Sequence, residues 1–111
     1  MKKKRNGHPE FYKILEKMKN IYESKNADYG GGNPLGNFLE CRRAGIDEID
    51  GVLTRLGDKF SRVYSLNKKR KEGKGGPEVK SEKMEDTLID LAVYSIICLV
   101  LLSDKENSNA E

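Results

Sequence analysis

The chain has 111 residues, of which 35% are charged and 36% apolar, a composition that indicates one compact soluble domain rather than a disordered chain. Its net charge of +3 is local, because residues 2–5 carry four positive charges and leave the remainder at −1. Nucleic acid is therefore not an expected partner. Cys41 and Cys98 lie far apart without metal-ligand spacing. They exclude a disulfide scaffold and favour a cytoplasmic protein.

Helices are predicted in chain order after a basic, flexible tail of residues 1–8. The first spans about residues 9–25, because apolar side chains recur every three to four positions from Phe11 to Tyr22. Asn33 and Pro34 are expected to start a short second helix that ends at Gly45.

Two longer helices follow. Asp47 is the expected N-cap of the third, which continues to about Lys69. After the glycine-rich connector at residues 72–79, Ser81 is the expected cap of a fourth helix ending near Ser103. A polar tail, 104–111, would remain. We therefore predict an all-α, small four-helix bundle-like domain over residues 9–103.

The stretch Leu91 to Leu102 is apolar nearly all round and is expected to be a buried helix. One small core can hardly cover such a helix, so oligomerisation is expected to complete the fold. Its twelve residues are fewer than the about 20 that cross a bilayer, so no membrane partner is expected.

An acidic row marks the start of the fourth helix. Glu82, Asp86 and Asp90 are four residues apart, which places like charges on one helix face. Asp90 has apolar neighbours on both sides in the sequence. A carboxylate in such a place needs a cation or several hydrogen-bond donors.

The third helix carries cations on one side, and two interpretations of the facing rows remain open. In the first, Asp86 and Asp90 pair with Lys59 and Arg62 and lock the two helices together. In the second, the carboxylates hold Mg²⁺ while the cations receive a polyphosphate. The cations are Arg55, Lys59 and Arg62, with Asp58 near them.

Glycines mark two places where a close approach is expected. Gly30 to Gly32 either bring the backbone near a ligand or supply positive φ between two helices. Beside them, Tyr29 or Phe38 would stack on a base and Asn37 would contact its edge. Gly51 and Gly57 cost about 1 kcal/mol each inside a helix, so a neighbouring backbone or ligand is expected near them.

Three motifs, "KNADYGG…NF", "GVLTRLGDKFSRV" and "EDTLIDLAVY", resemble in this order a family of small phage and bacterial proteins. The family is nucleotide modification associated domain 1, and the resemblance covers roughly residues 10–102. For a phage-encoded chain it implies the host cytoplasm. The last motif is also similar to the MazG-like all-α nucleoside triphosphate pyrophosphatases. Those dimers or tetramers bind Mg²⁺ and release a monophosphate and pyrophosphate.

The resemblance to the pyrophosphatases assigns roles by position. Glu82, Asp86 and Asp90 match the acidic helix, and Asp58 is a contributor from the facing helix. The chain departs from that group because it lacks the Glu-x-x-Glu pair of the first acidic helix. Nucleotide binding is therefore expected, while hydrolysis stays open.

We thus expect a phage-type, homo-oligomeric protein that binds a (deoxy)nucleoside polyphosphate with Mg²⁺. The alternatives are a non-catalytic, nucleotide-sequestering protein and a helical interaction module. Glu82, Asp86 and Asp90 are the expected catalytic residues, and with Asp58 the expected metal ligands. The expected substrate-binding residues are Lys25, Asp28, Tyr29, Gly30, Asn37, Phe38, Arg55, Lys59 and Arg62.

Overall fold

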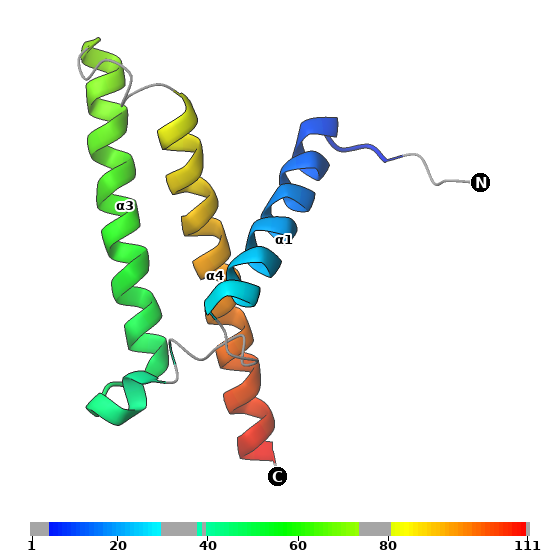
Figure 1. The fold of residues 1–111 in the computed structure, drawn as a ribbon, viewed down its shortest axis with the longest axis vertical. Coiled ribbons are helices and arrows are strands. Elements are labelled where there is room, and N and C mark those ends of the chain that lie inside the picture. Colours follow the sequence, from blue (N-terminus) through cyan, green and yellow to red (C-terminus); the bar gives the residue numbers. More distant parts are fainter. Residues whose placement is uncertain (1–4, 30–37, 39, 74–80, 111) are drawn as a thin grey trace. The chain divides into compact units, whose positions relative to one another are not determined.

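The computed structural model describes residues 5–29, 38, 40–73 and 81–110, and these residues are all-α (Figure 1). They form α1 (Pro9–Tyr29), the short 3-10 helix η1 (Glu40–Ala44), α3 (Glu48–Glu72) and α4 (Ser81–Ala110). The described part contains three α-helices and no strand, which confirms the all-α class. Where the end of a short second α-helix was expected, the described residues form η1, which is followed by Gly45 at φ 76°.

The chain divides into two compact units, residues 1–34 and 35–111. The first contains α1, which begins at Pro9, where the backbone N–H of Glu10 donates to Nδ1 of His8 at 3.1 Å. α1 ends at Tyr29, beyond the expected end near Lys25. Asp28 and Tyr29, which lie beyond the predicted end of this helix, therefore belong to it, because no helix-breaking residue comes before Gly30.

In the second unit, α3 lies between two capping residues, Asp47 and Gly73. Oδ1 of Asp47 accepts a hydrogen bond from the backbone N–H of Ile49 at 2.8 Å, which confirms Asp47 as the N-cap. At the other end Gly73 takes the left-handed conformation, with φ 67°, and its N–H donates to the carbonyl of Arg70 at 3.3 Å. The helix therefore ends at Glu72, slightly beyond Lys69.

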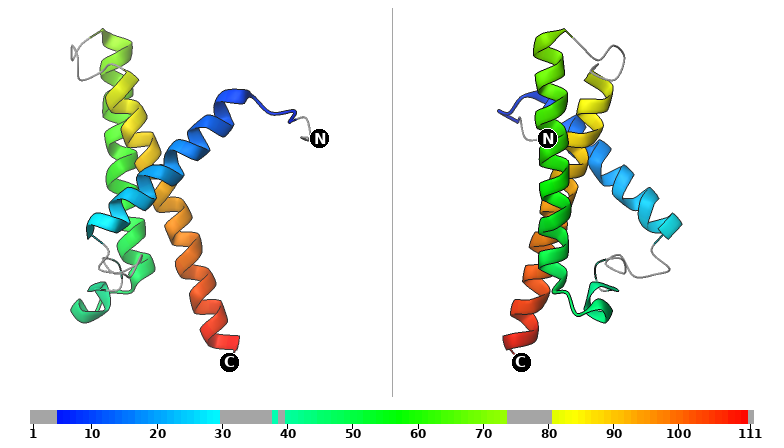
Figure 2. Two further views of the ribbon diagram at one scale, coloured as in Figure 1. Left: turned by 45° about the vertical axis from the view of Figure 1, so that its right-hand side comes forward. Right: turned by 90° about the vertical axis from the view of Figure 1, so that its left-hand side faces the viewer.

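α3 and α4 pack against each other as an antiparallel hairpin, and the two views of Figure 2 show them crossing obliquely. Val52 and Leu66 of α3 are buried, as are Ile97 and Leu101 of α4. α4 continues to Ala110, so the segment expected to be a polar tail after Ser103 is helical through that residue.

The expectation that Leu91 to Leu102 is a buried helix is wrong for much of its surface. Ile96 is 49% exposed and Leu99 is 65% exposed, although Ile97 and Leu101 are buried. Within α4, Met84–Lys105 is long and apolar enough to cross a membrane by length and composition alone. Only one side of this apolar helix is thus well covered.

Candidate functional site

An ion pair joins the middle of α3 to α4. Nζ of Lys59 lies 3.3 Å from Oδ2 of Asp90, and the two side chains are 31% and 29% exposed. This contact is one of those expected from the ion-pair interpretation. Both groups therefore keep part of their surface open to solvent.

An aromatic pair lies one helical turn further along α4. Tyr94 follows Asp90 by four residues and therefore shares its helix face. Its ring meets that of Phe38 edge to face, with centroids 5.8 Å apart and planes at 88°. Phe38 was expected to contact a base, whereas Tyr94 was not recognised from the sequence, although its spacing from Asp90 was a usable signal. We call Lys59, Asp90, Phe38 and Tyr94 the hairpin site.

Further predicted site residues lie along the same two helices. Asp86 is exposed one turn before Asp90, while Arg55 and Arg62 are exposed on either side of Lys59 along α3. Because the helices are antiparallel, Arg62 lies toward the level of Asp86 and Arg55 toward the level of Tyr94. Charged groups of both signs thus follow the hairpin for about two turns.

The remaining predicted ligands are not brought to this site by the described structure. Asp58 is exposed on α3. Among the described side chains, no three His, Cys, Asp or Glu residues are gathered in a way that could hold a metal ion. The side chains of Glu82, Asp28 and Tyr29 lie outside the described residues, as do Gly30 and Asn37 entirely, so their roles stay predictions.

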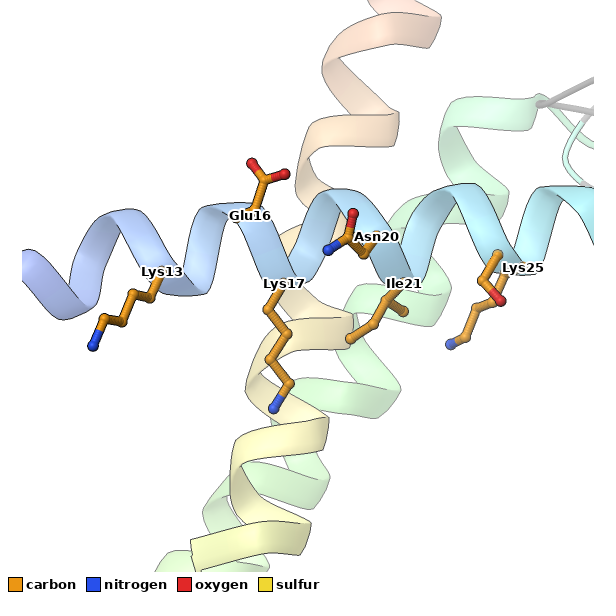
Figure 3. A pocket seen from close by; sticks show the side chains of 7 residues that line it. Lys13, Glu16, Lys17, Asn20, Ile21 and Lys25 are labelled. Carbon is orange, nitrogen blue, oxygen red and sulfur yellow. The ribbon is translucent and has the colours of Figure 1, made fainter.

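Lys25 belongs to α1, in the first unit, where it lines an open depression on that helix. Figure 3 shows Lys13, Lys17 and Lys25 pointing to one side of α1, away from Glu16. This face is therefore basic, and Lys25 stays a predicted phosphate ligand. The full lining consists of Lys13, Glu16, Lys17, Asn20, Ile21, Ser24 and Lys25.

A second polar cluster, which the sequence did not reveal, lies at the N-terminal end of α3. The carboxylate of Glu48 is almost fully buried and accepts hydrogen bonds from Nε of Arg42 at 3.0 Å and Nη2 at 2.6 Å. Nζ of Lys105 pairs with Asp47 and lies 4.0 Å from Oε1 of Glu48. The cluster thereby joins η1, the start of α3 and the end of α4.

Electrostatics in this cluster favour the charged forms. The hydrogen bonds from Arg42 lower the pKa of Glu48 to about 2, with a backbone hydrogen bond and the nearby positive charges adding to the effect. The hydrogen bond from Lys105 lowers the pKa of Asp47, and the same contact raises the pKa of Lys105. Since each of these carboxylates has a cation beside it, the cluster is better suited to holding the hairpin together than to binding a ligand.

The two glycines of α3 have different surroundings. A Cβ on Gly51 would lie 2.9 Å from Sγ of Cys41, a free thiol, so this glycine accommodates η1 rather than a backbone or a ligand. A Cβ on Gly57 would meet no other atom of the described residues within 4 Å. Gly57 therefore faces open space on the exposed side of α3.

Comparisons of the chain with family models, with curated proteins and with solved structures gave no match. The resemblance to nucleotide-handling families rests on its three sequence motifs.

Proposed function

We propose that this chain is a subunit of a cytoplasmic, all-α homo-oligomer that binds a (deoxy)nucleoside polyphosphate together with Mg²⁺. The hairpin site supports this proposal, because it combines an accessible ion pair with an aromatic pair one turn away on α4. A nucleotide presents two chemistries that suit these groups, a charged phosphate chain and a flat base.

The phosphate end of the ligand would lie along α3. Lys59 would exchange its contact with Asp90 for a phosphate oxygen, and the exposed Arg55 and Arg62 would add positive charge on either side. Asp90 would then coordinate Mg²⁺ with the exposed Asp86, since magnesium commonly combines one or two carboxylates with phosphate oxygens. Glu82 would complete the acidic row.

The base would stack on the aromatic pair. Phe38 and Tyr94 are half-buried, and base stacking on aromatic rings contributes about 1–3 kcal/mol per base. Because every base has a π-face, this contact favours nucleotides as a class without selecting one of them.

Hydrolysis to a monophosphate and pyrophosphate is the enzymatic form of this proposal. Mg²⁺ would supply charge stabilisation and lower the pKa of a bound water, and a carboxylate of the acidic row would take its proton. The second candidate function is a non-catalytic, nucleotide-sequestering protein. The lack of a Glu-x-x-Glu pair on a helix other than α4, where the pyrophosphatases have their first acidic helix, favours that alternative.

The same proposal includes a small four-helix bundle-like fold completed by oligomerisation. The exposed side chains of α4, among them Leu88 and Leu99, support it, because water is an unfavourable neighbour for so many apolar groups. Asp90 lies inside the apolar segment Met84–Lys105 and pairs with Lys59 of α3, which favours helix packing over membrane insertion. Finding the protein in the membrane fraction of disrupted cells would contradict a cytoplasmic location.

A thermal-shift panel of nucleoside mono-, di- and triphosphates, in ribo and deoxy forms, each with Mg²⁺ and with EDTA, tests the proposal. A ligand at 100 times its Kd stabilises a protein by about 2.7 kcal/mol, which is several degrees for this chain length. Lys59→Ala should abolish the shift relative to its own unliganded melting temperature, whereas Lys71→Ala, an exposed lysine near the end of α3, should preserve it. Product analysis of any ligand that binds separates hydrolysis from sequestration.

A panel without any shift would overturn nucleotide binding. An equal shift in Lys59→Ala and the wild type would overturn the hairpin site while leaving nucleotide binding standing. A shift that persists in EDTA without product would favour the sequestering alternative.

A further inference from the structure

α3 carries an exposed apolar row that α4 does not cover. Leu53, Phe60 and Tyr64 are 51%, 52% and 65% exposed, and Gly57 completes a spacing of four, three and four residues. This spacing is the seam of a helix that packs against another helix. At about 100° per residue, the row lies roughly 120° around α3 from the buried Val52 and Leu66.

Gly57 makes a gap in the middle of this row. The described residues leave the space beside its Cα empty to 4 Å, and the helix gains no turn or cap from a glycine there. Phe60, one turn away, projects a large ring that contacts only the edge of Tyr64 among the described aromatic side chains, with centroids 4.9 Å apart. The gap at Gly57 and the ring of Phe60 are complementary if a second α3 packs in the opposite direction. Phe60 of each copy then fits against Gly57 of the other.

Charges beside the row favour the same direction. Asp50 and Lys68 are both exposed, and their separation of 18 residues equals five helical turns, so they lie on one flank of the row. In an antiparallel pair of identical helices, this flank of one helix faces the same flank of the other. Centring the pair between Gly57 and Phe60 therefore sets Asp50 of one copy near Lys68 of the other, and the contact occurs twice.

We infer that the row Leu53, Gly57, Phe60 and Tyr64 is the surface through which two copies of this chain associate, with their α3 helices antiparallel. The interface is self-complementary about a two-fold axis, as in most homodimers. Leu53 lies opposite Tyr64 of the other copy, and Phe60 lies opposite Gly57. The inference specifies the self-association included in the proposed function, and its test needs no nucleotide.

Sedimentation velocity over a range of concentrations tests the surface directly. Phe60→Glu should convert a dimer into a monomer, because the pairing buries a charge against an apolar row. Leu15→Glu, at an exposed leucine of α1, is the control and should leave the dimer intact, while Leu99→Glu tests the exposed side of α4. A monomeric wild type would overturn self-association altogether. Dissociation by Leu99→Glu but not by Phe60→Glu would overturn only this surface.

A charge exchange tests the direction of the helices with variants that keep the apolar row. Asp50→Lys and Lys68→Asp should each weaken the dimer severalfold at low salt, and the double variant should recover the wild-type dissociation constant. Within one α3 the two side chains are about 27 Å apart, so they cannot pair in the same helix. Failure of the double variant to recover affinity, with both single variants weakened, would overturn the antiparallel arrangement. Circular dichroism should show the same helix content in every variant.

Discussion

Arg42 and Glu48 form a two-point ion pair, in which one guanidinium donates to both oxygens of one carboxylate. The carboxylate is buried while the guanidinium is largely exposed, with side-chain exposures of 3% and 61%. The buried partner is therefore the one that depends on the contact, because a buried carboxylate without a cation is costly. Glu48 thereby fastens η1 to the beginning of α3.

This pair predicts a distinctive loss of stability in acid. The folded-state pKa of Glu48 is about 2, against an ordinary value of 4.5 for the unfolded chain. The contribution of Glu48 is therefore fully present above pH 4.5 and is lost as the pH falls through 2. Glu48→Gln should lower the melting temperature by several degrees at pH 7, and its difference from the wild type should shrink steadily below pH 4.5. A constant difference from pH 7 to pH 2 would contradict the assignment.

Lys105 predicts that the end of α4 contributes to the stability of the hairpin. Lys105→Ala should lower the melting temperature, because the pairs with Asp47 and Glu48 are lost. The same substitution should raise the pKa of Asp47, since the hydrogen bond from Lys105 is the largest cause that lowers it. Asp104→Ala, at the exposed neighbouring position, is the matched control. Thermal unfolding and NMR titration of the Asp47 carboxylate measure the two effects, and equal melting temperatures for the two variants would contradict the role of Lys105.

Adjacent leucines of α4 should differ sharply in their contribution to the core. Leu101 is 2% exposed and Leu102 is 41% exposed, so only the first is fully surrounded by other side chains. Leu101→Ala should destabilise the fold by about 2–5 kcal/mol, through lost burial and the cavity that remains. Leu102→Ala should cost clearly less. Urea unfolding followed by circular dichroism gives both values, and similar losses would mean that α4 packs on a different side.

Substituting alanine for each of the two glycines of α3 should change the free energy of unfolding differently. Gly57→Ala should stabilise the monomer by about 0.5–1 kcal/mol, because the helix gains propensity and the new methyl group meets open space. Gly51→Ala should gain less or lose stability, since its Cβ would contact Sγ of Cys41 at 2.9 Å. Combining Cys41→Ala with Gly51→Ala should recover the stability that Gly51→Ala loses through this contact. Urea unfolding in a Phe60→Glu background separates these effects from self-association, and an equal gain at both glycines would contradict the close contact.

Local chemistry in the sequence predicted the start of α3 and placed its end within a few residues, whereas contacts between distant residues were not predictable. Asp47 accepts a hydrogen bond from a backbone N–H two residues away, so its effect can be recognised from sequence alone. The partner of Asp47 is Lys105, 58 residues away. Only the antiparallel packing of α3 and α4 brings these two charges together. The sequence had instead placed Lys105 in a polar tail.

The same limit applies to the hairpin site. A need for a cation near Asp90 followed from its apolar neighbours, and Lys59 was among the cations expected. Predicting the contact between Phe38 and Tyr94 requires knowing how the chain before η1 is positioned along α4. No local sequence pattern specifies that position. Similarly, the apolar character of α4 was evident from its composition, but which side α3 covers depends on packing.

Tyr94 predicts how the base of a bound nucleotide is held. Tyr94→Leu preserves an apolar side chain but removes the ring that meets Phe38, so nucleotide affinity should fall about 5- to 150-fold, the equivalent of 1–3 kcal/mol. Tyr64→Leu, which alters an exposed tyrosine of α3 outside the hairpin site, should leave the affinity unchanged when both tyrosine variants are made in the Phe60→Glu monomer. Inorganic tripolyphosphate with Mg²⁺ has no base and should bind the Tyr94→Leu variant as tightly as it binds the parent protein. Isothermal titration calorimetry of both ligands makes the comparison. A parallel loss of tripolyphosphate binding would show that Tyr94 supports the phosphate end rather than the base.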